Sequence, residues 1–172
     1  MTPLGALARG LVASAVGTLA MDTLLFSRYR RGGGTDRFPA WEFSAGVEKW
    51  DDAPAPAQVG KRLVEGLFQR PLPPERARLV NNVMHWAFGL LNGVQYGLVA
   101  GSLRNPRLRY GVPFAVGVWG SGYAVLPAAG LYEPIWEYDA TTLARDLSAH
   151  LVFGLTTAAA FKALTRMAGR AA

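Results

Sequence analysis

The sequence predicts an all-α membrane protein in which four helices cross a bilayer. Charged residues make up only 17% of the chain, against about 25% in soluble domains. Several apolar runs are long enough to cross about 30 Å of hydrocarbon. Basic residues gather at the ends of these runs, as they do where helices leave a membrane towards anionic headgroups. We therefore expect one membrane domain that covers residues 1–172.

The first spanning helix is predicted at residues 4–27. It carries Asp22 near its end, where an ionised carboxylate needs a partner or a place near the interface. A basic cluster, residues 28–31, follows directly. This cluster favours a stop-transfer boundary over the alternative of a secretory signal peptide.

A long polar loop, residues 28–78, separates the first helix from the second. Glycine and proline breakers interrupt it. From Gln58 to Gln69 one apolar stripe recurs at helical spacing between charged residues. This pattern predicts an amphipathic helix that lies in the membrane interface.

The other three spanning helices are predicted at residues 79–103, 110–132 and 147–167. The first two are uncharged and longer than the roughly 20 residues that a membrane span needs. Asn105-Pro106 interrupts the helical pattern between them and predicts a turn. The last run contains Lys162, whose long side chain can reach the interface from the final turns.

An internal repeat contains both histidines of the chain. The pattern Asn/Asp-x-x-x-His-x-x-Phe-Gly-Leu occurs once from Asn81, with His85, and once from Asp146, with His150. Each copy begins a predicted spanning helix, and one helix lies between them, so the two helices run in the same direction. The repeat therefore predicts two parallel-repeat pairs of helices.

Polar side chains within the predicted spans are the candidates for function. In each copy of the repeat, the Asn or Asp precedes the His by four residues, which places both on one helical face. Such an arrangement is typical of a proton relay or a ligand site, but also of hydrogen bonds that hold membrane helices together. The sequence leaves both interpretations open for Asp22, Asn81, His85, Asn92, Tyr96, Asp146 and His150.

Small residues form a second pattern on the predicted helices. They recur at every fourth position, which permits two helix backbones to approach closely. The pattern predicts packing within the bundle, with a homodimer seam as the alternative. The residues are Gly89, Gly93, Gly97 and Gly101 on the second helix, and Gly117 and Ser121 on the third.

The composition excludes several kinds of chemistry. The chain has no cysteine, which removes disulfides, thiolate metal sites and thiol nucleophiles. It also lacks the phosphate-binding loop, the G-x-S-x-G turn and the H-E-x-x-H motif. A zinc ion needs three or four ligands, and only Asp22 and Asp146 accompany the histidines, so no metal, cofactor or catalytic residue is expected.

The net charge of +6 does not indicate nucleic acid, because the basic residues border apolar runs and form no separate patch. The expected partner is the lipid bilayer. A homo-oligomer and a membrane-protein partner both stay open.

Four stretches together carry a family resemblance: Gly17-Thr18-Leu19-Ala20-Met21-Asp22, the His-x-x-x-Gly-x-x-x-Gly pattern from His85, Gly117-Val118-Trp119 through Leu126-Pro127, and Ala149-His150-Leu151-Val152-Phe153-Gly154. In these motifs the chain resembles the YagU-like family of small bacterial inner-membrane proteins. The resemblance implies a multi-pass, four-helix protein of the bacterial inner membrane with undefined biochemical activity. It supplies no catalytic residues, and residues 41–52 have no counterpart in it.

Two functional hypotheses follow. The first is a non-enzymatic bundle with an accessory role or a role in handling a small solute or protons. The alternative is a membrane-embedded enzyme acting on a lipid-like substrate, with His85, His150, Asp22 and Asp146 as acid/base candidates. An enzyme needs these groups in one cavity, whereas packing contacts need each group paired with a separate neighbour.

Overall fold

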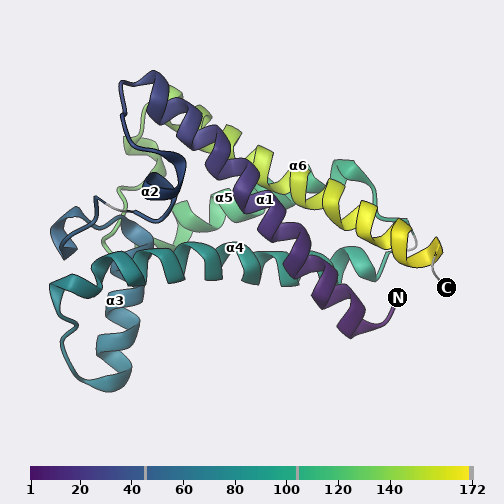
Figure 1. Ribbon diagram of the computed structural model, residues 1–172, viewed down its shortest axis with the longest axis horizontal. Helices are drawn as coiled ribbons and strands as arrows, with labels where there is room; N and C mark the ends of the chain where they lie inside the picture. Colours follow the sequence, from purple (N-terminus) through teal and green to yellow (C-terminus); the bar gives the residue numbers. More distant parts are fainter. Residues whose placement is uncertain (45, 104, 171–172) are drawn as a thin grey trace.

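The computed structural model describes residues 1–44, 46–103 and 105–170, and these residues form helices and connections without a strand (Figure 1). Short 3-10 helices η1 to η4 lie in the connections, at Trp50–Asp52, Pro74–Arg76, Leu108–Tyr110 and Ile135–Glu137. The α-helices are α1 (Pro3–Arg31), α2 (Phe38–Glu42), α3 (Ala55–Phe68), α4 (Ala77–Gly101), α5 (Gly111–Val125) and α6 (Ala140–Arg170).

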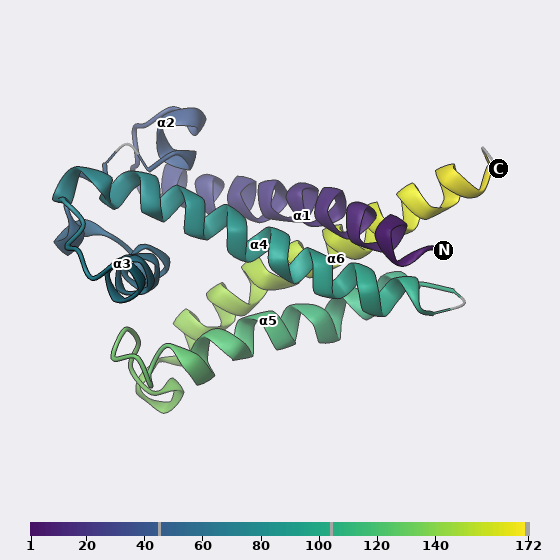
Figure 2. The same cartoon turned by 90° about the horizontal axis from the view of Figure 1, so that it is seen from below.

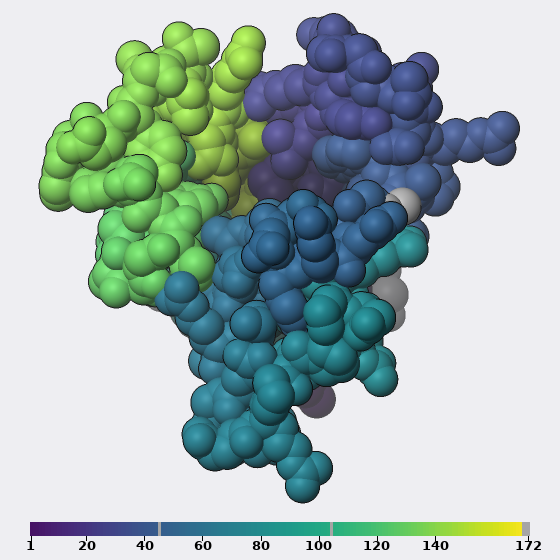
Figure 3. Space-filling view, turned by 90° about the vertical axis from the view of Figure 1, so that its left-hand side faces the viewer, coloured from purple at the N-terminus to yellow at the C-terminus, as the bar shows by residue number. Residues whose placement is uncertain are grey.

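Four long helices, α1, α4, α5 and α6, run up and down alongside one another (Figure 2). The N-terminus, the α4–α5 connection and the end of α6 lie at one end of the molecule. Helices α2 and α3 and the α5–α6 connection lie at the other end, which Figure 3 shows face on. Helices α4 and α6 therefore run in the same direction. Helix α1 packs against both of them, while α5 packs against α6 and α3 against α4.

The α1–α4 contact is made by glycines. A Cβ added at Gly97 would lie 2.9 Å from the Cα of Gly10 and closer still to the carbonyl of Ala6. A Cβ at Gly101 would lie 2.7 Å from the Cβ of Ala6, and one at Gly93 would overlap the side chain of Ser14. The glycine stripe on α4 therefore packs within the chain against α1.

As a prediction of packing within the chain, the extension of this stripe to α5 was wrong, whereas the homodimer alternative stays a prediction. Nothing lies within 4 Å of a Cβ added at Gly117, and the Ser121 hydroxyl donates to a carbonyl of its own helix. Helix α5 instead meets α6 through Gly111, where an added Cβ would lie 2.8 Å from the Cα of Leu155. Four-residue spacing marks a helix face, but it does not reveal which face meets a neighbour.

Two of the predicted helix boundaries were also wrong. Helix α5 ends at Val125 rather than at residue 132, because Pro127 has no N–H to continue the helical hydrogen bonds. Helix α6 begins seven residues before the predicted start, because Asp139 caps it. The Asp139 carboxylate accepts hydrogen bonds from the backbone N–H groups of Thr141 and Thr142 and from the Thr142 hydroxyl. These bonds, chiefly the one from the hydroxyl, hold the pKa of Asp139 below its usual range.

Two helices, α1 and α6, are long and apolar enough to cross a membrane. Only 33% of the residues in an apolar 18-residue stretch of each helix are buried. The buried residues are mostly small ones, among them Ala6, Ala13, Ser14 and Thr18. Some aromatic side chains are buried with them, among them Phe153 and Phe161, whereas many large aliphatic side chains are exposed. Most of these exposed aliphatic side chains lie on α1, α3, α4 and α5. They include Leu11, Val12, Val16 and Leu19 on α1, Leu63 and Leu67 on α3, Leu91, Leu98 and Val99 on α4, and Val112 and Val116 on α5.

Helix α3 is the amphipathic helix that the sequence predicts between Gln58 and Gln69. Gly60 faces α4, since a Cβ added there would lie 2.5 Å from side-chain atoms of Val80 and Met84. Leu67 and Phe68, in contrast, are exposed. In Figure 1 the helix stands across the direction of α4.

Candidate functional site

Both histidines line one cavity of about 380 Å³ between the four long helices. His85 reaches it from α4 and His150 from α6. Apolar side chains form most of the remaining wall, and α3 contributes Val59. The volume lies within the range of about 300–1,000 Å³ in which small-molecule sites are found.

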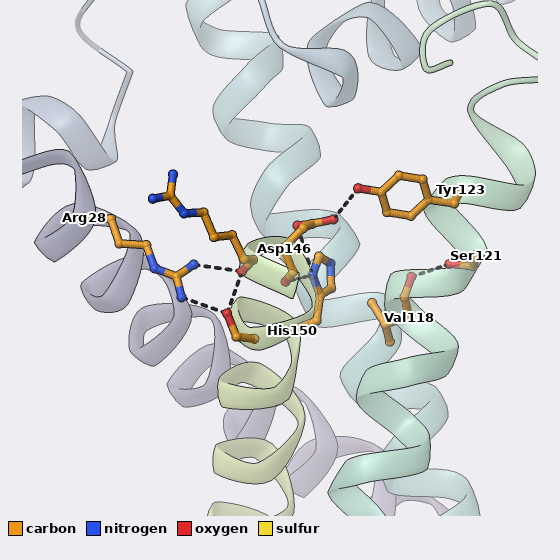
Figure 4. A network of polar contacts seen from close by, with 8 residues as sticks. Arg28, Val118, Ser121, Tyr123, Asp146 and His150 are labelled. Carbon is orange, nitrogen blue, oxygen red and sulfur yellow. Dashed lines mark hydrogen bonds and ion pairs between the residues drawn. The ribbon is translucent and has the colours of Figure 1, made fainter. Parts of the chain in front are cut away.

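The His150 side of the cavity contains the local pair that the repeat predicts (Figure 4). The Nδ1 atom of His150 lies 3.3 Å from Oδ1 of Asp146 and 3.0 Å from the main-chain oxygen of the same residue. The Tyr123 hydroxyl on α5 donates to Oδ2 of Asp146 at 3.0 Å. An Nδ1–H tautomer would donate to Asp146, which leaves Nε2 of His150 available to a ligand.

Arg28 ties α1 to the first turns of α6 beside this pair (Figure 4). Its guanidinium donates to the carbonyl of Arg145 and to the hydroxyl of Ser148, each at 2.8 Å. The basic cluster after the first helix therefore has a structural role here that the sequence did not reveal.

The His85 side of the cavity is built differently from its repeat. Oδ2 of Asp22, from α1, lies 3.0 Å from Nε2 of His85. Asn81, which holds the position equivalent to Asp146, donates to the Ser44 hydroxyl at 2.6 Å instead. The carboxylate partner in this copy therefore comes from another helix and not from the repeat itself.

Glu42 is the site residue that sequence reasoning missed. It ends α2, is only 8% exposed, and has one carboxylate oxygen, Oε1, that is buried and accepts no hydrogen bond from the residues that the structure describes. Its ligand atom and those of Asp22 and His85 all lie within 4.8 Å of one another. Burial raises the pKa of Glu42, and the nearby Asp22 carboxylate raises it further. No motif surrounds Glu42, so nothing local in the sequence marks it as a site residue.

The other two predicted polar residues on α4 do not line the cavity. The Asn92 amide donates to the carbonyl of Phe88 in its own helix at 2.9 Å. Tyr96 is buried between the rings of Phe114 and Phe161, with centroid distances of 4.8 and 5.6 Å. The predicted polar line on this helix is therefore divided among separate environments.

Fold and site together define an all-α protein, with two helices fit to cross a membrane and a mainly apolar cavity that has a carboxylate–imidazole pair on each of two sides. No family model matches the chain, and no curated protein or solved structure matches it.

Proposed function

We propose that the chain is an integral membrane protein in which α1, α4, α5 and α6 all lie in the bilayer. Two observations support this proposal: large aliphatic side chains are exposed along α1, α4 and α5, and glycine, alanine and serine make the close contacts between the long helices, as small residues do between membrane helices. Helix α4, with 25 residues, measures about 37 Å, and α5, with 15, about 22 Å. Helix α5 therefore reaches both interfaces only together with its connections.

With the four long helices in the bilayer, the positions of α3 and the termini relative to the membrane follow. The exposed Leu67 and Phe68 of α3 would enter the interface at the end of the bundle that holds α2. The termini and the α4–α5 connection would lie on the opposite side of the membrane. The resemblance to the YagU-like family suggests that this membrane is the bacterial inner membrane, and that assignment is part of the proposal.

Reporter fusions test the topology. Fusions after Asn105 and at the C-terminus should report the same side, and fusions after Arg31 and Tyr138 should both report the other side. A dual phosphatase and β-galactosidase reporter measures the side of each fusion. Opposite sides for Asn105 and the C-terminus would exclude four spans.

For the cavity, we propose the binding of a small amphipathic molecule, without catalysis. The observation that carries this proposal is that His85 and His150 line one mainly apolar cavity. Its walls suit an apolar body, and the two imidazoles are placed to meet a polar group. A membrane-embedded enzyme acting on a lipid-like substrate is the second candidate, because His85 also belongs to the carboxylate cluster with Asp22 and Glu42.

A cavity-filling substitution tests this binding. Gly122 lines the cavity, and nothing lies within 4 Å of an added Cβ there, so Gly122→Leu should occupy the space without a clash. Labelling by a diazirine-bearing fatty acid in lipid nanodiscs, mapped by mass spectrometry, should weaken by at least about tenfold, which corresponds to about 1.4 kcal/mol.

Gly120→Leu is the matched control for this substitution. Gly120 is equally open around its added Cβ but does not line the cavity, so its labelling should equal that of the wild type. Equal labelling of Gly122→Leu and the wild type would contradict binding in the cavity.

A further inference from the structure

Three metal-ligating groups from three separate helices meet beside the cavity. Asp22 comes from α1, Glu42 from α2 and His85 from α4, and one ligand atom from each lies within 4.8 Å of the other two. Two ligands bound at about 2.0–2.1 Å to a tetrahedral ion stand about 3.3 Å apart. The 3.0 Å between Oδ2 of Asp22 and Nε2 of His85 is close to this spacing, and a bound ion would draw the Glu42 carboxylate in to the same spacing.

The burial of the two carboxylates is the second observation. Asp22 is 2% exposed and Glu42 is 8% exposed, and among the described residues Oε1 of Glu42 has no hydrogen-bond partner. Two buried carboxylates beside one imidazole are costly unless a proton or a cation offsets part of their charge, and a bound metal ion would take the place of that proton. Arg28, which follows Asp22 on the same helix, donates instead to Arg145 and Ser148.

We propose that Asp22, Glu42 and His85 together bind one divalent transition-metal ion. Imidazole nitrogen suits zinc and other first-row metals, and carboxylate oxygen suits manganese and also binds zinc. The +2 charge of the ion offsets the charges of the two carboxylates. Three protein ligands leave a coordination position open for water or for a polar group of a bound molecule, as in catalytic zinc sites.

The second carboxylate–imidazole pair does not form such a site. His150 and Asp146 supply two ligand residues, and Asp146 is already held by the Tyr123 hydroxyl. His85 lines the cavity as well as the cluster, so the open coordination position lies beside the cavity. The metal site does not depend on what occupies the cavity.

Metal titration of the full chain tests the proposal. The protein, purified without a polyhistidine tag and stripped with a chelator, is titrated in detergent with Zn²⁺ and separately with Mn²⁺ by calorimetry. The wild type should bind one ion per chain and melt at a higher temperature with the ion bound. Glu42→Gln should weaken binding by more than about 100-fold, beyond the loss that removal of a supporting group causes.

Glu48→Gln is the matched control, because Glu48 is an exposed carboxylate in the same connection. It should bind the ion as the wild type does. Glu42→Gln suits the test because it keeps the size of the side chain, and Oε1 of Glu42 accepts no hydrogen bond from the described part of the chain. A wild type without stoichiometric binding of either ion, or equal affinity in Glu42→Gln and the wild type, would overturn the proposal.

Discussion

Gly97→Leu is expected to lower the free energy of unfolding by about 3 kcal/mol or more, beyond the usual range for overpacked cores. An added Cβ at Gly97 meets the carbonyl of Ala6 and lies 2.9 Å from the Cα of Gly10. These atoms belong to the backbone of α1, so no side-chain rotation can relieve the overlap. Thermal unfolding in detergent, followed by circular dichroism, measures the loss.

Gly117→Leu is the matched control for this substitution. Gly117 also lies within a long helix, but nothing lies within 4 Å of its added Cβ, so its melting temperature should change little. Unchanged melting of Gly97→Leu would contradict the α1–α4 seam. A loss of dimer with unchanged melting would favour the homodimer seam that the sequence left open.

The helix pattern was largely predictable, because apolar runs and charge boundaries are local features. The boundaries failed where a single residue decided them. Pro127 ends α5 inside an uncharged run, and Asp139 starts α6 within a stretch whose charges suggested a loop. The uncharged run from 110 to 132 is longer than α5 because Pro127 lies inside the run.

Prediction of the site followed the same division between local and distant contacts. His150 and Asp146 stand four residues apart, and this spacing alone predicted their pairing. The partner of His85 is 63 residues away in the chain, and Glu42 comes from a five-residue helix without a motif. The expectation of no metal rested on counting only Asp22 and Asp146 beside the histidines, and it did not consider Glu42.

The two histidine pairs should differ sharply in what their loss costs. In metal-free protein, His85→Ala is expected to lower the free energy of unfolding by about 3–5 kcal/mol, because it leaves a buried carboxylate without its partner. The Asp22 side chain is only 3% exposed. Adding Asp22→Asn to His85→Ala should recover part of the loss, since it removes the stranded charge. Chemical unfolding in detergent measures both variants.

His150→Ala is the matched control and should cost less. The Asp146 side chain is 35% exposed and keeps the hydrogen bond from Tyr123 when the imidazole is removed. Because each imidazole has its own carboxylate partner, the losses of His85→Ala and His150→Ala should add within about 0.5 kcal/mol in the double variant. A double variant that loses no more than His85→Ala alone would show that the two histidines act as one unit across the cavity.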